Sequence, residues 1–292
     1  MSSTPGAYFS SFSESPRAKS AVYLYAAGSM AAGVLDLIWG EFEAAHQPIQ
    51  AFGDHIPGRE VLATVAALLL IAGGAAILWR RTARVGAAVL AGIYVVFAVF
   101  WLPRFYTAPH ALGFRAPVFI GMLGGVAQQL ILVGAAGILY AWLHAHDANG
   151  RSRALRVGRW VFGLSSIDFG LGHLTGVQEV AGMVPKWMPL GGGFWAIGTG
   201  VAFVAAGVAI VARRTDVLAA RLLALMLFVF SVTVLAPGPF VHPHNHVAWG
   251  SNAYNLAAVG AVWIYAEAIA VLRARTKVEI PGLASNTGYP VL

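Results

Sequence analysis

Long runs of apolar residues, separated by short polar segments, dominate the hydrophobic pattern of this chain. A helix needs about 20 mostly apolar residues to cross the roughly 30 Å hydrocarbon core of a bilayer. Eight runs meet this requirement, at residues 20–40, 61–79, 85–103, 116–142, 157–176, 192–212, 217–237 and 252–272. The 157–176 run is the least apolar, because it contains Asp168 and several glycines. The pattern predicts an all-α membrane protein with eight transmembrane helices.

The same pattern occurs twice along the chain. An offset of 132 residues aligns Asp36 with Asp168 and Pro57 with Pro189, and an Arg-Arg-Thr turn between two apolar runs occurs at 80–82 and again at 213–215. Such self-similarity indicates a duplicated unit, and ligand sites in duplicated membrane folds tend to lie between the repeats.

Each copy of the pattern supplies four of the predicted helices. We therefore predict two four-helix repeats, at residues 20–145 and 155–275, joined by a polar linker around 144–153. Because an even number of spans returns the chain to its starting side, both repeats enter the membrane from the same side and are parallel. Residues 1–19 are predicted to be a polar tail, and 278–292 a disordered one.

Positive charge lies mostly on one side of the predicted spans. Of the 19 Lys and Arg residues, 15 fall on the side of the N-terminal tail and four on the other. Lys and Arg are enriched in cytoplasmic loops, so both termini are expected to be cytoplasmic. With an odd number of spans the Lys and Arg residues would be distributed over both sides of the membrane. The charge distribution therefore independently favours eight spans.

Composition narrows the classes of function. Apolar residues make up 58% of the 292 residues and charged residues 11%, against roughly a quarter charged in soluble domains. The net charge of +7 does not indicate nucleic-acid binding, because the basic residues lie in short loops at membrane ends. There is no cysteine, which excludes thiol–disulfide exchange and thiolate-ligated iron–sulfur or haem centres within the chain. The expected environment is the lipid bilayer.

Two acids are the strongest candidates for chemistry. Asp36 and Asp168 occupy equivalent positions near the outer ends of the first helix of each repeat. A carboxylate within a span costs about 2.5–3.5 kcal/mol on insertion scales, so it should face the bundle interior or an aqueous pocket. We interpret both as catalytic, proton-exchanging groups facing a shared pocket. The alternative is a structural carboxylate bonded to a neighbouring amide, Trp or Tyr.

Other polar residues lie within the later spans. Gln129 and Asn255 are equivalent through the alignment of Gly134 with Gly260, and each has a neighbouring amide, Gln128 or Asn252. They either line a polar pocket or form hydrogen bonds between helices. Glu267, toward the cytoplasmic end of the last span, is expected to pair with Arg273 or Arg275.

Histidines gather in the predicted outer loops. His242, His244 and His246 alternate along a segment that Pro243 keeps from being helical, so two imidazoles share one face and can chelate one metal ion or bind a haem. A third ligand could come from His110 or His173, with His46 and His55 further along the first outer loop. The alternative is a solvated loop whose histidines titrate near pH 6.5.

The outer loops are also rich in tryptophan. Trp39, Trp101, Trp187, Trp195 and Trp249 fall near outer boundaries of the spans, as in an interfacial aromatic belt, although a quinone ring could also stack there. Glycines such as those of Gly121-x-x-x-Gly125 are expected to allow helices to approach closely.

The second half carries a family resemblance. Arg159, Gly163, Gly170 and Gly172 follow one another along one helix, then comes the loop Val184-Pro185-Lys186-Trp187-Met188-Pro189 and a glycine-rich helix from 191 to 207. This order resembles the DoxX/DoxD-like membrane proteins, four-helix units associated with respiratory quinone chemistry. In that family DoxD is a subunit of a thiosulfate:quinone oxidoreductase, and bacterial DoxX proteins are linked to membrane oxidoreductase complexes.

The resemblance covers about 157–273, and the first half enters it through the internal repeat. The chain differs from the family in having His173 and Glu41 where a lysine is common, and in being a fused pair. The resemblance implies a multi-pass protein of a bacterial or archaeal plasma (inner) membrane, linked to quinone and to a membrane or periplasmic oxidoreductase partner. The residues assigned to quinone binding are Trp39, His173, Trp187, Gln129 and Asn255.

Three hypotheses follow. In the first, the chain is a redox-associated subunit that binds quinone or quinol in a polar pocket between the repeats at the outer side and passes protons through the two aspartates. In the second, it is a small-solute transporter that uses the same cavity. In the third, it is a non-catalytic scaffold for a membrane oxidoreductase complex. The first is preferred.

Overall fold

The computed structural model describes residues 15–46, 57–143 and 148–284, and all regular structure in these ranges is helical. The long helices are α2 (Pro16–Trp39), α3 (Arg59–Ile77), α4 (Ala83–Phe100), α6 (Ala116–Trp142), α7 (Ala148–Thr175), α9 (Gly191–Val211), α10 (Asp216–Phe230) and α12 (His246–Ala284). The short ones are α5 (Arg104–Leu112), α8 (Val177–Met183), the π-helix η1 (Ser231–Leu235) and α11 (Gly238–Val241). The all-α prediction is confirmed.

Seven helical runs in the described ranges are long and apolar enough to cross a membrane. They are Pro16–Trp39, Arg59–Ile77, Ala83–Leu112, Ala116–Trp142, Gly191–Val211, Asp216–Val241 and His246–Ala274. Helix α7 covers the remaining predicted run and is 28 residues long. It is less apolar than the others, because four arginines at 151–159 occupy its first half.

Several predicted boundaries are wrong. Helix α2 begins at Pro16, inside the predicted polar tail, because proline is well suited to a first helical turn. Helix α7 begins at Ala148, inside the predicted linker, and α12 extends to Ala284, into the predicted disordered tail. The extension of α7 contains Arg and Ala, which are good helix formers. Residues 1–14, 47–56, 144–147 and 285–292 lie outside the described residues.

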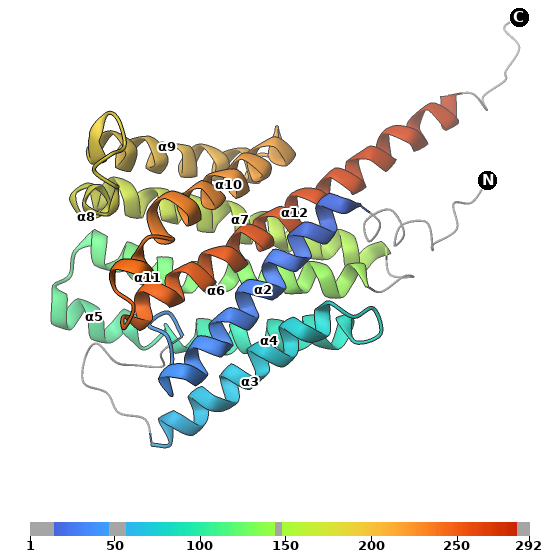
Figure 1. The fold of residues 1–292 in the computed structure, drawn as a ribbon. Helices are drawn as coiled ribbons and strands as arrows, with labels where there is room; N and C mark the ends of the chain where they lie inside the picture. The colour runs from blue at the N-terminus through green and yellow to red at the C-terminus, as the bar shows by residue number, and fades with distance from the viewer. Residues whose placement is uncertain (1–14, 47–56, 144–147, 285–292) are drawn as a thin grey trace, which may run out of the picture.

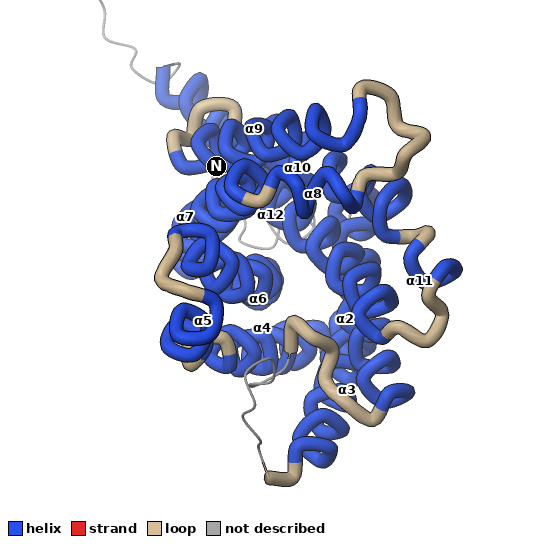
Figure 2. Tube along the Cα trace, turned by 90° about the vertical axis from the view of Figure 1, so that its left-hand side faces the viewer, coloured by secondary structure: helices blue, strands red, loops and turns tan. Residues whose placement is uncertain are grey.

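The long helices form a closed sequence of neighbours. Each of α2, α3, α4, α6, α7, α9, α10 and α12 packs against the next, α12 returns to pack against α2, and α12 also contacts α6 across the interior. In Figure 1 the start of α2 and the end of α12 lie at the same end of the bundle. Helices α5, α8 and α11 lie at the opposite end, which faces the viewer in Figure 2.

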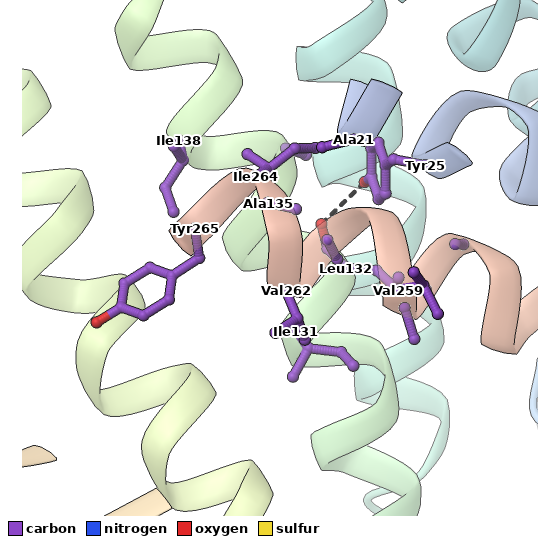
Figure 3. Packing of buried hydrophobic residues seen from close by; sticks show 14 of the residues in the cluster. Ala21, Tyr25, Ile131, Leu132, Ala135, Ile138, Val259, Val262, Ile264 and Tyr265 are labelled. Atoms are coloured by element: carbon purple, nitrogen blue, oxygen red, sulfur yellow. Dashed lines mark hydrogen bonds between the residues drawn. The ribbon is translucent and has the colours of Figure 1, made fainter. Parts of the chain in front are cut away.

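A close backbone contact in the interior joins α2 to α12. A Cβ at Gly28 would lie 2.7 Å from the carbonyl oxygen of Ala253, and a Cβ at Gly260 would lie 2.7 Å from that of Ala21. Glycine at both positions therefore lets the two backbones touch. Figure 3 shows α12 between α2 and α6, where the Tyr25 hydroxyl donates a hydrogen bond of 2.9 Å to the carbonyl oxygen of Leu132.

The outer faces of the helices are apolar. Large apolar side chains are exposed along them, among them Ile38, Val61, Leu68, Val85, Leu164, Val201 and Leu218. A protein in water would have to bury a surface of this kind, whereas lipid tails solvate it. This surface and the seven apolar runs indicate that the chain is embedded in a lipid bilayer.

Ion pairs hold the end of the bundle where α12 finishes. Arg221 of α10 pairs with Glu267 at 2.9 Å, and Arg273 pairs with Asp216 at 2.9 Å. The partner of Glu267 is therefore Arg221 and not Arg273, while the side chain of Arg275 lies outside the described residues. The reason is packing: α10 lies against α12 and brings Arg221 to the buried carboxylate.

Candidate functional site

The two aspartates singled out by the sequence have different surroundings. Asp36 is one turn from the end of α2 and is 1% exposed. Gly40 adopts a left-handed conformation (φ +63°) that ends α2 and turns the chain back, as is common for glycine at a helix end. The following residues then cover Asp36, and the backbone N–H of Glu43 donates a 2.8 Å hydrogen bond to its Oδ1.

Two imidazoles face the Asp36 carboxylate. His46 Nδ1 lies 3.5 Å from Oδ2, and His246 Nε2, at the start of α12, lies 3.4 Å from Oδ1. Both rings are held by aromatic neighbours: His246 stacks on Trp39 with centroids 4.7 Å apart, and His46 stacks on Phe97 at 4.2 Å. Asp36 is thus enclosed by partners from two segments, the residues after α2 and the start of α12.

The surroundings of Asp36 determine the protonation of His46. Burial by itself lowers the pKa of His46, but its close approach and attraction to Asp36, with the nearby charge of Glu43, outweigh burial, so the pKa of His46 is raised. A protonated His46 beside an ionised Asp36 is the arrangement that these contacts favour.

Residues 42–46, here called the inserted segment, fill the interior of the first half. Phe42 packs edge-on against Phe97 and Phe100, with centroids 6.3 and 6.4 Å apart. The Glu43 carboxylate accepts a 2.7 Å bond from the N–H of Ala45. The carbonyl oxygen of Ala45 accepts bonds from the Trp101 indole (2.9 Å) and the Gln129 amide (3.2 Å). The segment is therefore fixed by packing and hydrogen bonds together.

Asp168 has no such cover. Within the described residues its Oδ2 has no hydrogen-bond partner. Gly172 stands where Gly40 stands at the 132-residue offset, but α7 continues through it to Thr175, and the chain then forms α8, which packs on α9. Gln129 and Asn255 are 126 residues apart in the sequence. The same offset aligns Ile120 with His246. An apolar side chain thus replaces the imidazole that faces Asp36.

Asp168 lies in the wall of a cavity of about 910 Å³. The wall comes from α6, α7, α9, η1, α10 and α12 and from residues 180–188, so it includes helices of both predicted repeats. It is mostly apolar, not polar as expected, and neither Lys nor Arg contributes to it. The polar side chains in it are Gln128, Asp168, His173, Thr199, Thr233, Tyr254 and Asn255 and the indoles of Trp101 and Trp195.

Glycines on α6 make room for this cavity. Gly121 lines it and an added Cβ there would have no atom within 4 Å, while a Cβ at Gly124 would meet Asp168 Oδ2 at 3.3 Å. Gly125 is covered by the ring of Trp101. The expectation that Gly121 brings two helices together is therefore wrong, because this face of α6 is turned to a space and not to another backbone.

His173 is the second titratable group of the cavity. Its Nδ1 lies 2.9 Å from the carbonyl oxygen of Phe169. A carbonyl only accepts, so Nδ1 carries the proton and Nε2 of the neutral ring is an acceptor. The ring lies between Phe203 and Phe230, with centroid distances of 5.1 and 6.3 Å.

A π-helical turn borders the cavity. In η1 the N–H of Ala236 bonds to the carbonyl of Ser231, five residues back. The amide of Asn252 donates to the Leu235 carbonyl at 2.8 Å, and that of Asn255 to the Leu227 carbonyl at 2.8 Å and the Ser231 hydroxyl at 2.6 Å. π-Turns are frequent at functional sites, and here two amides of α12 hold one in place.

The structure separates the residues assigned to quinone binding. His173 and Asn255 line the cavity with Asp168. Trp39 and Gln129 instead belong to the surroundings of Asp36. Trp187 is 70% exposed and does not contribute to the wall. Asp36 is sealed in the first half, so the two aspartates do not share one pocket.

The outer histidines are dispersed. His242, His244 and His110 are exposed, His110 bonds to the carbonyl of Tyr106, and His246 turns to Asp36. His55 lies outside the described residues. Nowhere in the ranges that the structure describes are three His, Asp or Glu side chains placed to hold a metal ion together. The predicted set of ligands does not form, because His110 on α5 and His242 and His244 after α11 are exposed while His246 turns to Asp36.

Sequence reasoning missed two features. The pairing of His246 with Asp36 depends on the α2–α12 contact, which joins residues some 210 positions apart, and that of His46 depends on the chain turning back after Gly40. The hollow beside Gly124 could have been suspected from the three small residues at 121, 124 and 125 on one helix.

The fold and the site define a multi-pass membrane protein with a ligand-sized cavity inside its helical bundle. Comparisons of the chain with protein-family models, with curated proteins and with solved structures gave no match.

Proposed function

We propose that the chain is an eight-span protein formed by two parallel repeats of a DoxX-like four-helix unit, with both ends in the cytoplasm. The packing supports this: the α2–α12 contact has its counterpart in the α6–α7 contact, and the fourth helices, α6 and α12, meet each other. In this proposal α7 is the eighth span. Its arginines lie at the cytoplasmic end and Asp168 toward the outer end.

The topology is testable because the chain contains no cysteine. Two variants each introduce a single thiol. Asn149→Cys places it in the first turn of α7, and Trp187→Cys places it beyond the other end of this helix. In intact cells a membrane-impermeant maleimide should label only Cys at 187, and permeabilisation should expose the one at 149. Labelling of both in intact cells, or of neither, would show that α7 does not cross the membrane.

We further propose that the protein is a quinone-linked, redox-associated membrane subunit of a bacterial or archaeal plasma membrane, acting with a membrane oxidoreductase. The observation that carries this is the mostly apolar cavity of about 910 Å³, whose wall includes the His173 imidazole and a carboxylate oxygen, Asp168 Oδ2, that has no hydrogen-bond partner among the described residues. A quinone has a polar ring and an apolar tail, and such a cavity suits both.

The cavity also reaches the lipid-facing surface. Phe194, Leu222 and Leu225 line it and are each more than half exposed on the outside of α9 and α10. A ring held near Asp168 can therefore extend an isoprenoid tail between these helices into the bilayer. Lipid-soluble ligands need no aqueous route to such a site.

The test uses two substitutions on α6. Gly121→Leu places a large side chain in the cavity. Gly137→Leu, on the same helix, is the control: Gly137 does not line the cavity, and a Cβ there would have no described atom within 4 Å. Protein purified in mild detergent should retain quinone in the parent and the Gly137→Leu variant and lose it in Gly121→Leu. Absence of quinone from the parent, with no binding of added short-chain quinone, would overturn the proposal.

One observation favours transport as a second candidate. Helix α10 becomes a π-turn beside the cavity and is followed by Pro237 and the short α11, and interrupted helices line pathways in transporters. Proteoliposomes that show flux of small solutes driven by a proton gradient, blocked by Gly121→Leu, would support it. Lack of any such flux would count against it.

A further inference from the structure

Hydrogen-bond donors in the wall of the cavity are mostly engaged with the protein itself. The indoles of Trp101 and Trp195 donate to the carbonyls of Ala45 and Pro189. The hydroxyls of Thr199 and Thr233 donate to carbonyls one turn back in their own helices. The amide of Asn255 donates to Leu227 and Ser231, as described above. With no Lys or Arg in the wall, Gln128 and Tyr254 carry the remaining side-chain donors.

Acceptors, by contrast, remain open toward the cavity. Asp168 Oδ2 has no partner within the described residues, and in its ionised form this carboxylate accepts hydrogen bonds only. His173 uses Nδ1–H on Phe169, which leaves Nε2 as an acceptor. A ligand that brings acceptors of its own, such as the two carbonyls of a quinone, would find few donors here. A ligand that brings O–H donors would satisfy both groups.

The first half shows what occupies the corresponding space. There the inserted segment presents the Glu43 N–H to Asp36, and two imidazoles face the same carboxylate beside the aromatic ring of Phe42. In the first half, N–H groups and aromatic rings thus fill the space next to Asp36. The corresponding space next to Asp168 is hollow. The equivalent carboxylate in the second half lacks these partners.

We infer that the cavity binds the reduced, hydroquinone form of its ligand in preference to the oxidised form, through O–H donation to Asp168 and His173. This inference rests on the proposed quinone-class function. A hydroxyl donating to an ionised carboxylate forms one of the stronger hydrogen bonds in proteins, and leaving that carboxylate buried and unpaired is unfavourable.

The experiment measures binding of one short-chain ubiquinone in three forms to the full chain in detergent. The forms are the quinone, its hydroquinone under anaerobic conditions, and the dimethyl ether of the hydroquinone, which keeps the ring but lacks both O–H groups. Quenching of tryptophan fluorescence reports binding, because Trp101 and Trp195 line the cavity. The hydroquinone should bind about tenfold tighter than the other two.

Variants of the chain show which side chains cause the preference for the hydroquinone. Asp168→Asn, whose amide both donates and accepts, should bring the three affinities within about threefold of one another. His173→Phe, which removes the Nε2 acceptor, tests the second contact and serves if Asp168→Asn does not fold. Gly137→Leu should keep the full preference.

The outcomes separate the inference from the proposed function. Equal or tighter binding of the quinone or of the dimethyl ether would overturn the inference while leaving a quinone-class site in place. An unchanged preference in both Asp168→Asn and His173→Phe would do the same. Failure of all three forms to bind the parent chain would overturn the proposed function itself.

Discussion

The two halves of the chain place an aspartate at corresponding positions and use it differently. In the first half, Asp36 is sealed by the inserted segment, His46 and His246, and the interior is filled. In the second half, Asp168 faces a cavity of about 910 Å³ and lacks a partner for Oδ2 within the described residues. Two aspartates related by the 132-residue offset therefore differ: one holds its own chain together and the other faces a cavity.

The largest expected difference between the halves is in stability. Asp36→Leu leaves two buried imidazoles and the Glu43 N–H without their acceptor, and breaking a buried charged pair costs about 3–5 kcal/mol. Asp168→Leu removes a carboxylate whose Oδ2 has no hydrogen-bond partner among the described residues, so its effect should stay within about 1 kcal/mol. Thermal unfolding in detergent measures both. Equal destabilisation would show that Asp168 is also a structural group.

Two glycines on equivalent positions of α6 and α12 sharpen the comparison. At Gly250 an added Cβ would lie 2.8 Å from Cδ and 3.0 Å from Oε1 of the buried Glu43, so Gly250→Ala should destabilise the protein by about 1–3 kcal/mol. At Gly124 the same methyl meets one atom, Asp168 Oδ2, at 3.3 Å. Gly124→Ala should therefore change the melting temperature little and weaken ligand binding. A larger loss of stability at Gly124 than at Gly250 would contradict the contrast between a filled and a hollow half.

The open half can be made to resemble the closed one. Ile120 lines the cavity at the position that corresponds to His246. Ile120→His should bring an imidazole to Asp168 and lower the affinity for the short-chain hydroquinone roughly tenfold, the loss of about one good hydrogen bond to a charged group. Ile120→Leu is the matched control and should bind normally. Unchanged binding in Ile120→His would mean that Ile120, although aligned with His246 in sequence, does not occupy the corresponding place next to Asp168.

The smallest expected effect is a pH dependence of the closed half. The pKa of His46 is raised in the folded protein above its ordinary value of about 6.5, so its pairing with Asp36 stabilises the fold fully below that pH. This contribution is lost as the pH rises through the folded pKa. The parent should therefore melt higher than His46→Gln near pH 6, and the difference should shrink as the pH is raised. A difference that grows with pH would show that His46 is neutral in the fold.

Much of the architecture follows from the sequence because it rests on local pattern. Apolar runs of about 20 residues predicted helices, and seven of them in the described ranges are long and apolar enough to span a membrane. Asp168, His173 and Asn255 were also assigned to a site from sequence, and all three line the cavity. A polar residue within an apolar span is rare enough to be noticed without a structure.

Other assignments failed because they depend on distant contacts. Trp39 and Gln129 were assigned to the ligand but hold the closed half, since the α2–α12 contact brings His246 against Trp39 and the inserted segment reaches Gln129. His246 was grouped with His242 and His244 by spacing along the chain, yet its partner is Asp36 on another helix. Spacing in sequence carries no information about which helix packs on which.

The sequence by itself determined that this chain is helical, apolar and suited to a bilayer, and that it places similar residues at matching points of its two halves. Only the tertiary structure decided which of the two acids is available. Gly40 and Gly172 are the same residue at matching positions, but one ends its helix and the other lies within it. The difference comes from what each following segment can pack against: residues 42–46 gain an interior lined by Phe97, Trp101 and Gln129, whereas the chain after Thr175 packs on α9.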